Sequence, residues 1–198
     1  MNIWFATNNR HKKDELAAIL GRDLKIPADE GYSFNPEETG QTFYENSLIK
    51  ARELYKLLGK NEVVIADDSG LCVDGLDGRP GVLSARYGME NGKKLTSLQQ
   101  NIMLLDELGD NSVRTARFVC SMALLLDNNR FYIVQETLEG EIVEKSQMRG
   151  DGGFGYDPIF FVPHLNCTLA QASADEKNAL SHRGKAGKLI ADLLIKVT

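Results

Sequence analysis

The stretch that most constrains the fold is a pair of aspartates directly after an apolar run. Val63-Val64-Ile65 leads into Ala66-Asp67-Asp68-Ser69-Gly70. β-Branched residues bounded by turn formers predict a buried strand. Carboxylates at the end of such a strand lie where open α/β sheets bind their ligands. Because successive strand side chains point to opposite faces of a sheet, we expect Asp67 and Asp68 to have different roles.

This acidic pair has two interpretations. Mg²⁺ takes one or two carboxylates together with substrate phosphates, so two aspartates at a strand end suit a magnesium site. A polar turn that only closes the strand would contain the same residues. A motif of this kind is a hypothesis until its context supports it, and the other polar segments supply that context.

Size and composition narrow the class of protein. The chain has 198 residues, of which 42% are hydrophobic, and this predicts a single globular domain over residues 1–198. A net charge of −5 without a basic block disfavours duplex nucleic acid as a partner. The apolar run at the start of the chain is too short and too soon interrupted to be a signal peptide. No apolar run approaches the roughly 18 residues of a membrane span. We therefore expect a cytoplasmic protein without membrane association.

The cysteines agree with this location. Cys72, Cys120 and Cys167 are widely spaced and odd in number. Such spacing is typical of reduced thiols and not of a metal site or a disulfide framework.

Strand and helix signals alternate along the chain. The expected strands are Ile3–Ala6, the run at Val63, Arg117–Leu126 and Phe131–Thr137, the last two joined by a hairpin turn at Asp127–Arg130. The expected helices run from about Arg10 to Gly21, from the Thr42–Glu45 capping box to Gly59, from Lys94 to Leu108, and from near Arg183 onward. In the last helix the residues expected to face inward are Ala186, Leu189, Ile190, Leu193 and Leu194. Gly75–Gly88 is expected to be a loop, and Ser173–Glu176 a second capping box.

Two segments near the N-terminus carry candidate ligands. Thr7–Lys12 joins a strand to a helix, where backbone amides and the helix dipole favour an anion such as a phosphate. An Asn at this place is also simply a good N-cap. Glu37 and Glu38 precede the second helix. In one interpretation, one of them completes a metal site with the aspartate pair. In the other, both only stabilise the start of the helix.

Two segments in the second half are equally unusual. Gly152–Asp157 has three glycines within four residues, which brings backbone close to a flat or bulky ligand. Its aromatic residues could stack on a base while Asp157 reads the base edge; a strained turn with buried aromatics is the alternative. Lys177 and Ser181-His182-Arg183 lie near helix starts, where cations oppose the dipole, and this indicates a bound anion.

Together these segments resemble the inosine triphosphatase family, whose members are also called XTP/dITP diphosphatases. The matching segments appear in family order over nearly the whole chain. They are Phe5–Asn9 with Lys12 and Glu15, Glu37–Phe43 with Glu45-Asn46 and Lys50-Ala51, Ala66–Leu71 with Val73, Pro80–Val82, Ser84–Tyr87, Gly153–Phe160, Glu176–Asn178 and Ser181–Arg183. One position departs from the family: Asn8 stands where Gly is usual. Asn tolerates positive φ better than most residues, so we expect the same loop path.

The resemblance implies a fold and an activity. The family fold is an elongated, two-lobed α/β structure around a long mixed β-sheet, with a central substrate cleft, and its members are usually homodimers. The implied activity is Mg²⁺-dependent hydrolysis of ITP, dITP and XTP to the nucleoside monophosphate and pyrophosphate, which cleanses the nucleotide pool.

The resemblance also implies roles for particular residues. Glu37 and Asp68 would bind Mg²⁺, and Asp68 would accept a proton from the attacking water. Glu38 competes with Glu37, which we favour because it stands three residues before Gly40. The residues that would contact substrate are Thr7, Asn8, Asn9, Arg10, His11, Lys12, Ser69, Phe154, Gly155, Tyr156, Asp157, Lys177, His182 and Arg183.

Two alternatives remain at this stage. The first is a Maf-like nucleotide pyrophosphatase that acts on other modified nucleotides. Ser181-His182-Arg183 and the Gly153–Asp157 loop argue against it. The second is a nucleotide-binding sensor without catalysis, and intact Glu37, Asp67 and Asp68 argue against that.

Overall fold

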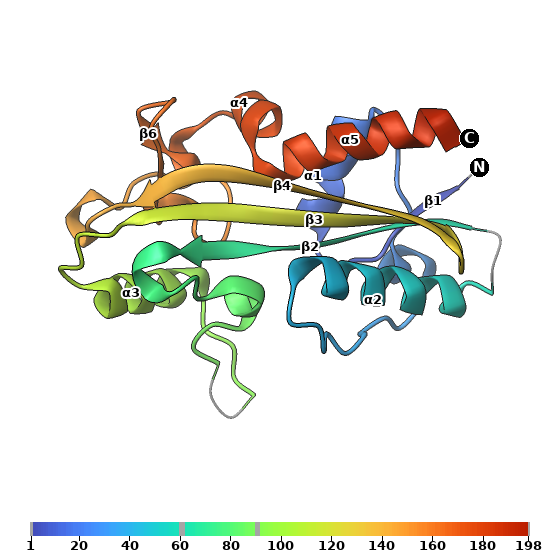
Figure 1. Cartoon of the computed structure of the whole chain (residues 1–198), viewed down its shortest axis with the longest axis horizontal. Coiled ribbons are helices and arrows are strands. Elements are labelled where there is room, and N and C mark those ends of the chain that lie inside the picture. Colours follow the sequence, from blue (N-terminus) through green and yellow to red (C-terminus); the bar gives the residue numbers. More distant parts are fainter. Residues whose placement is uncertain (1, 60–61, 90–91, 198) are drawn as a thin grey trace. The chain divides into compact units, whose positions relative to one another are not determined.

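A mixed β-sheet is the framework of the protein. The computed structural model describes residues 2–59, 62–89 and 92–197. Within these residues six strands form one sheet in the order β1-β2-β3-β4-β5-β6 (Figure 1). The strands are β1 (Ile3–Phe5), β2 (Val63–Val73), β3 (Thr115–Asp127), β4 (Arg130–Ile142), β5 (Phe160–Val162) and β6 (Cys167–Thr168). The β1–β2 pair is parallel and the β4–β5 and β5–β6 pairs are antiparallel, so the predicted mixed α/β sheet is confirmed.

Helices flank this sheet. They are α1 (Arg10–Leu20), α2 (Phe43–Leu57), α3 (Ser97–Leu108), α4 (Ala174–Leu180) and α5 (His182–Val197), with short 3-10 turns between several elements. No helix among the described residues is long and apolar enough to cross a membrane.

The described contacts divide into two compact units. The first comprises Met1–Ser69, Cys120–Glu136 and Ser181–Thr198, and the second comprises Gly70–Val119 and Thr137–Leu180. Strands β2, β3 and β4 contribute residues to both units. A single domain over residues 1–198 remains a prediction.

In the first unit the strand alternation sorts side chains onto two faces. One face packs against α1 and α5 through Ile3, Phe5, Val63 and Ile65. The other packs against α2 through Trp4, Ala6, Val64 and Ala66. Figure 1 shows α1 and α5 on one side of these strands and α2 on the other. Both faces of β1 and β2 are thus buried, which explains their nearly continuous apolar sequence.

Helix ends in the first unit follow the expected local chemistry. Asn9 caps α1, and Gly21 ends it at φ 62°, a left-handed conformation that suits glycine. Thr42 and Glu45 form the predicted capping box of α2. In α5 the buried residues recur at Ala186, Ile190 and Leu194.

One inward-facing prediction for α5 is wrong. Leu189 is 40% exposed. It lies one residue before Ile190, and adjacent residues are about 100° apart around a helix, so Leu189 turns away from the buried stripe.

The second unit has its own apolar core. Leu104, Leu105 and Leu108 of α3 share it with Leu71 and Val73 of β2. Helix α3 begins at Ser97 and not at the predicted Lys94, because Thr96 and Gln99 form a capping box there. The predicted loop Gly75–Gly88 contains 3-10 turns at Asp74–Leu76 and Gly81–Arg86.

Strand β2 is longer than predicted. It continues through both aspartates to Val73, so Asp67 and Asp68 lie in its middle and do not form a turn at its end. The predicted hairpin is confirmed, with β3 and β4 longer than expected and joined at Asn128-Asn129. The Asn129 amide donates to Asp127 Oδ1 at 2.8 Å and closes this turn.

Candidate active site

Asp67 lies at the centre of a cluster of cations in the first unit. Its side chain is 1% exposed. Lys12 Nζ donates to its Oδ1 at 3.0 Å, and the Nε and Nη2 atoms of Arg183 donate to its Oδ2 at 3.3 and 3.2 Å. Burial works to raise the pKa of Asp67, but the Lys12 and Arg183 charges outweigh it and hold this pKa below its ordinary range. Asp67 is therefore an ionised, fully engaged carboxylate.

Arg183 bridges several partners from the first turn of α5. Its Nη1 donates to Glu15 Oε2 at 2.7 Å and its Nη2 to Ser69 Oγ at 2.8 Å, in addition to Asp67. Burial opposes its charge, but the Asp67 and Glu15 carboxylates outweigh burial and raise its pKa. The two carboxylates compensate for the unfavourable interaction between the Arg183 charge and the helix dipole. The sequence had predicted that a bound anion does so.

Asp68 faces the opposite side of β2, as the alternation predicts. Lys50 Nζ, from α2, donates to Asp68 Oδ1 at 2.8 Å and lies 3.0 Å from Glu38 Oε1. Asn46 Nδ2 donates to Asp68 Oδ2 at 3.4 Å. Burial raises the pKa of Asp68, and the Lys50 charge acts against that rise. The two aspartates thus have separate partners on separate faces.

Lys50 is a site residue that the sequence reasoning did not single out. It occupies the buried stripe of α2 between Asn46 and Leu54, at four-residue spacing. Burial opposes its charge, but Asp68, Asp67 and Glu38 raise its pKa, so it remains an ammonium. A lysine on an otherwise buried helical stripe is the signal that could have found it, because lysine is almost never buried without a partner.

One cation of the Thr7–Lys12 loop, Lys12, contacts an aspartate of β2. Lys12 reaches Asp67, whereas Arg10 donates to Asp29 at 2.6 Å and His11 is exposed. Asn9 Oδ1 accepts from the His11 and Lys12 amides at 3.0 and 3.3 Å, which makes Asn9 the N-cap of α1. Thr7 Oγ1 accepts from the Asn9 amide at 3.1 Å.

Asn8 does not use the positive φ that asparagine tolerates, and the expected loop path stays a prediction. Among the described residues other than glycine, positive φ occurs at Asp77 and Asn166, so Asn8 makes the turn without it. Its Nδ2 donates to the Phe34 carbonyl at 2.6 Å and ties the loop to a neighbouring segment.

The acidic segment before α2 presents its two glutamates differently. Glu37 is exposed, whereas Glu38 is partly buried and ion-paired with Lys50. In the described part of the chain, no three His, Cys, Asp or Glu side chains are grouped to hold a metal ion. Asp68 and Glu38 nevertheless converge on one cationic group, and two carboxylate oxygens are the hard ligands that Mg²⁺ takes besides phosphates. The carboxylate oxygens of Asp68 and Glu38 are therefore suitable ligands for Mg²⁺. Glu37 as a ligand stays a prediction.

The second unit holds the glycine-rich loop. The Phe154 amide donates to Asp157 Oδ2 at 2.9 Å, and Lys177 Nζ donates to the same oxygen at 2.9 Å. The Lys177 ammonium lies 4.6 Å from the centre of the Phe154 ring. A Cβ at Gly153 would lie 2.0 Å from Asp157 Oδ2, so this position requires glycine. Phe154, Asp157 and Lys177 thus form one contact group.

Two other predicted contact residues are buried. Tyr156 is buried in the second unit, where its hydroxyl donates to the Ser84 carbonyl at 2.9 Å. His182, next to Arg183 in the first unit, is also buried.

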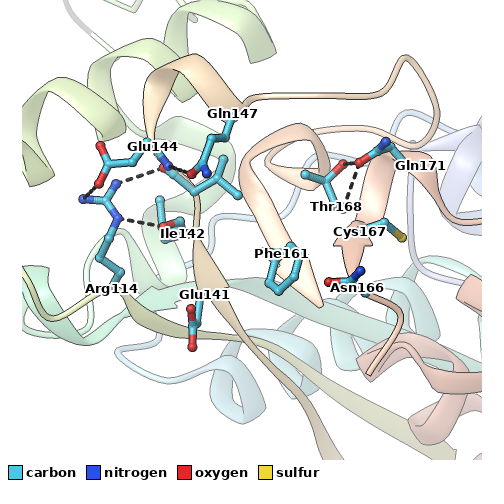
Figure 2. A pocket seen from close by; sticks show the side chains of 11 residues that line it. Arg114, Glu141, Ile142, Glu144, Gln147, Phe161, Asn166, Cys167, Thr168 and Gln171 are labelled. Carbon is cyan, nitrogen blue, oxygen red and sulfur yellow. Dashed lines mark hydrogen bonds and ion pairs between the residues drawn. The ribbon is translucent and has the colours of Figure 1, made fainter. Parts of the chain in front are cut away.

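A cavity of about 410 Å³ also lies in the second unit (Figure 2). Its polar side chains are already used within the fold: Arg114 donates from Nε to the Ile142 carbonyl at 2.8 Å, and from Nη2 to the Val143 carbonyl at 2.9 Å. Gln171 Oε1 accepts from the Thr168 amide at 3.1 Å. None of the residues predicted from the sequence lines this cavity, so it is not the candidate site.

The sheet and its buried ions define the class of protein. It is an α/β protein in which the interior strand β2 carries two oppositely directed aspartates, each paired with lysine or arginine. The chain belongs to the Ham1 family, whose model matches residues 3–193. This confirms the family resemblance predicted from the motifs.

Relatives and solved structures agree with this assignment. A dITP/XTP pyrophosphatase of Treponema denticola is 49% identical over 187 residues, which cover 94% of each chain. A dITP/XTP pyrophosphatase of Bacillus subtilis is 42% identical over 192 residues, or 96% of this chain and 94% of the relative. The Ham1 proteins of Staphylococcus aureus and Coxiella burnetii are each 37% identical with full coverage of both chains, at TM-scores of 0.86 and 0.88. The chain therefore has the Ham1 fold.

Proposed function

We propose that this protein hydrolyses ITP, dITP and XTP to the nucleoside monophosphate and pyrophosphate. The observation that carries the proposal is the pair of aspartates on opposite faces of β2, with Lys12 and Arg183 on one face and Lys50 on the other. Relatives that carry the name dITP/XTP pyrophosphatase support this substrate class. The Maf-like alternative and the silent sensor are not favoured.

We assign phosphate and water chemistry to the first unit. Asp68 is the proton acceptor for the attacking water, since burial raises the pKa of its carboxyl group and its side chain, which is 10% exposed, is less enclosed than that of Asp67. Asp67 is a supporting residue that holds Lys12 and Arg183 in place. Lys12 and Lys50 are the cations that neutralise phosphate oxygens, a role for which the point charge of lysine is suited. Ser69, Thr7–His11 and His182 stay predicted substrate contacts.

Mg²⁺ is the cofactor in this proposal, held by Asp68 with Glu37 or Glu38. The structure supports Glu38 through its contact with Lys50, and the family position supports Glu37. When bound, Mg²⁺ supplies charge neutralisation to the phosphates. The residues of the chain bind and orient the substrate and accept the proton.

We assign base recognition to the second unit. Phe154 offers an aromatic face, and Lys177 and Asp157 hold the loop around it. A site that pairs with a 6-keto group leaves polar atoms unpaired against a 6-amino group, which discriminates more strongly than shape alone. Gly155 supplies backbone without a side chain, at φ 65°. A cytoplasmic homodimer completes the proposal, supported by the family resemblance and, for the location, by the three free thiols.

A substrate panel tests the proposal. Purified protein with Mg²⁺ is assayed for pyrophosphate release from ITP, dITP, XTP, ATP and GTP. We expect rapid release from the first three and far slower release from ATP and GTP. Equal rates on all five nucleotides would remove the proposed selectivity, and inactivity on all would remove the enzyme assignment.

A further inference from the structure

Tyr156 belongs to a hydrogen-bond chain in the second unit that the proposed function leaves unexplained. Its hydroxyl donates to the Ser84 carbonyl at 2.9 Å. The Ser84 hydroxyl accepts from the Leu71 amide at 2.8 Å and donates to the Gly81 carbonyl at 2.6 Å. Gln100 Nε2 lies 3.5 Å from the same Ser84 carbonyl. Ser84 thus joins β2, the 3-10 turn Gly81–Arg86 and Tyr156 near the end of the glycine-rich loop.

The glycine-rich loop is held at its start and at its end, where Tyr156 adds a second anchor beside the Lys177–Asp157 ion pair. The Gly152 amide donates to the Ala170 carbonyl at 3.2 Å, which holds the start. Gly153 and Gly155 follow with φ values of 71° and 65°. Glycines restrict the backbone least of all residues, so the loop position depends on what holds its far end. Tyr156 is the first buried side chain after these glycines.

The hydrogen bond of the Tyr156 hydroxyl is an interaction separate from the packing of its ring. The ring is part of the apolar core of the second unit, and its burial does not require the hydroxyl group. A buried hydroxyl must find a partner, and its direction then fixes how the ring is seated. Burial raises the pKa of Tyr156, so the hydroxyl keeps its proton and acts as the donor.

We propose that Tyr156 is a positioning residue for base recognition, one that acts through its neighbours without touching the base. This inference rests on the proposed function. The Tyr156–Ser84 hydrogen bond holds the end of the loop against the turn Gly81–Arg86 and thereby sets the position of Phe154 and Asp157. The proposal replaces the predicted stacking role of Tyr156.

Hydrogen exchange tests the positioning directly. The variant Tyr156→Phe keeps the ring and removes the hydroxyl. Tyr87→Phe is the matched control, because Tyr87 is a buried tyrosine of the same core whose hydroxyl is bonded to Glu107. We expect faster amide exchange in peptides covering residues 150–158 of Tyr156→Phe, and unchanged exchange there in Tyr87→Phe. Equal exchange in the wild type and both variants would overturn the proposal.

Kinetics provide the second readout. In Tyr156→Phe we expect the ratio of kcat/KM for ITP to that for ATP to fall roughly fivefold, through a higher KM for ITP at similar kcat, as one lost hydrogen bond implies. Tyr87→Phe should keep the wild-type ratio. A ratio that changes equally in both variants would reduce Tyr156 to a packing residue. If the wild type does not hydrolyse ITP, the proposed function fails, while the exchange experiment still decides the positioning role.

Discussion

At the residue scale, the two aspartates of β2 differ in their surroundings more than in their sequence. Asp67 is enclosed by Lys12, Arg183 and Ser69, whereas Asp68 contacts Lys50 and Asn46 and is the less buried of the two. The ion pairs among these interactions join residues that are 18 to 116 positions apart. The alternation of a strand predicts that the side chains separate, but no local pattern specifies which partner each one finds.

The roles of the two aspartates are tested by paired substitutions. Asp68→Asn should lower kcat by at least the roughly 10²-fold that is typical of a lost acid–base group, with little change in the folded structure. Asp67→Asn should instead lower the melting temperature, because it leaves the buried Arg183 and the partly buried Lys12 with a weaker partner. The measurement is steady-state kinetics with thermal unfolding of both proteins. A fully active Asp68→Asn beside an inactive, stable Asp67→Asn would reverse the assignment.

Arg183 is predicted to matter for stability because it pairs with the buried Asp67 carboxylate and the partly buried Glu15 carboxylate. Arg183→Ala leaves Asp67 and Glu15 without this partner and should lower the free energy of unfolding by about 3–5 kcal/mol. Arg10→Ala is the control, since Arg10 pairs with Asp29 at the surface and should cost less than about 1 kcal/mol. Urea unfolding measures both. Similar losses in the two variants would contradict the buried network.

At the element scale, the local signals predicted the starts of α1, α2 and α5 well, whereas the start of α3 was predicted three residues too early. The capping boxes at Thr42 and Ser173 could be predicted from the sequence because the cap residue and its partner are three residues apart. Strand β2 was predicted too short, since Asp, Ser and Gly normally end strands. The strand continues because Lys12, Arg183 and Lys50 neutralise its charges, and these cations come from other elements.

The candidate site was also only partly predictable from local signals in the sequence. Lys12, Asp68, Asp157 and Lys177 were found by residue type and family position, and the structure gives each of them a charged partner. Lys50 did not stand out in the sequence, because it lies on the buried stripe of α2 and not in a polar loop or at a strand end. The Glu38 contact also could not be read from the sequence, since two adjacent glutamates are locally equivalent.

The cap of α2 provides a test at this scale. Thr42→Ala removes the hydroxyl that accepts from the Glu45 amide and should cost about 1 kcal/mol of unfolding free energy. Thr39→Ala, at an exposed position before the helix, should cost almost nothing. Chemical denaturation of the two variants measures the difference. Equal stabilities would show that the capping box contributes little to α2.

At the scale of the whole molecule, two units carry different parts of the proposed activity. The first holds the aspartates, Lys12, Lys50 and Arg183, and the second holds Phe154, Asp157 and Lys177. Membership of the Ham1 family and structures with TM-scores of 0.86 and 0.88 establish the fold on which these residues are placed. Substrate class follows from the site and from the relatives, not from the fold alone.

The position of bond cleavage is the central claim, and ³¹P NMR of a reaction with ITP and Mg²⁺ tests it most directly. Cleavage between the α- and β-phosphates gives IMP and pyrophosphate in equal amounts, with no IDP at any time. The account predicts this pair of products. Accumulation of IDP with orthophosphate would show cleavage at the terminal phosphate and would contradict the account.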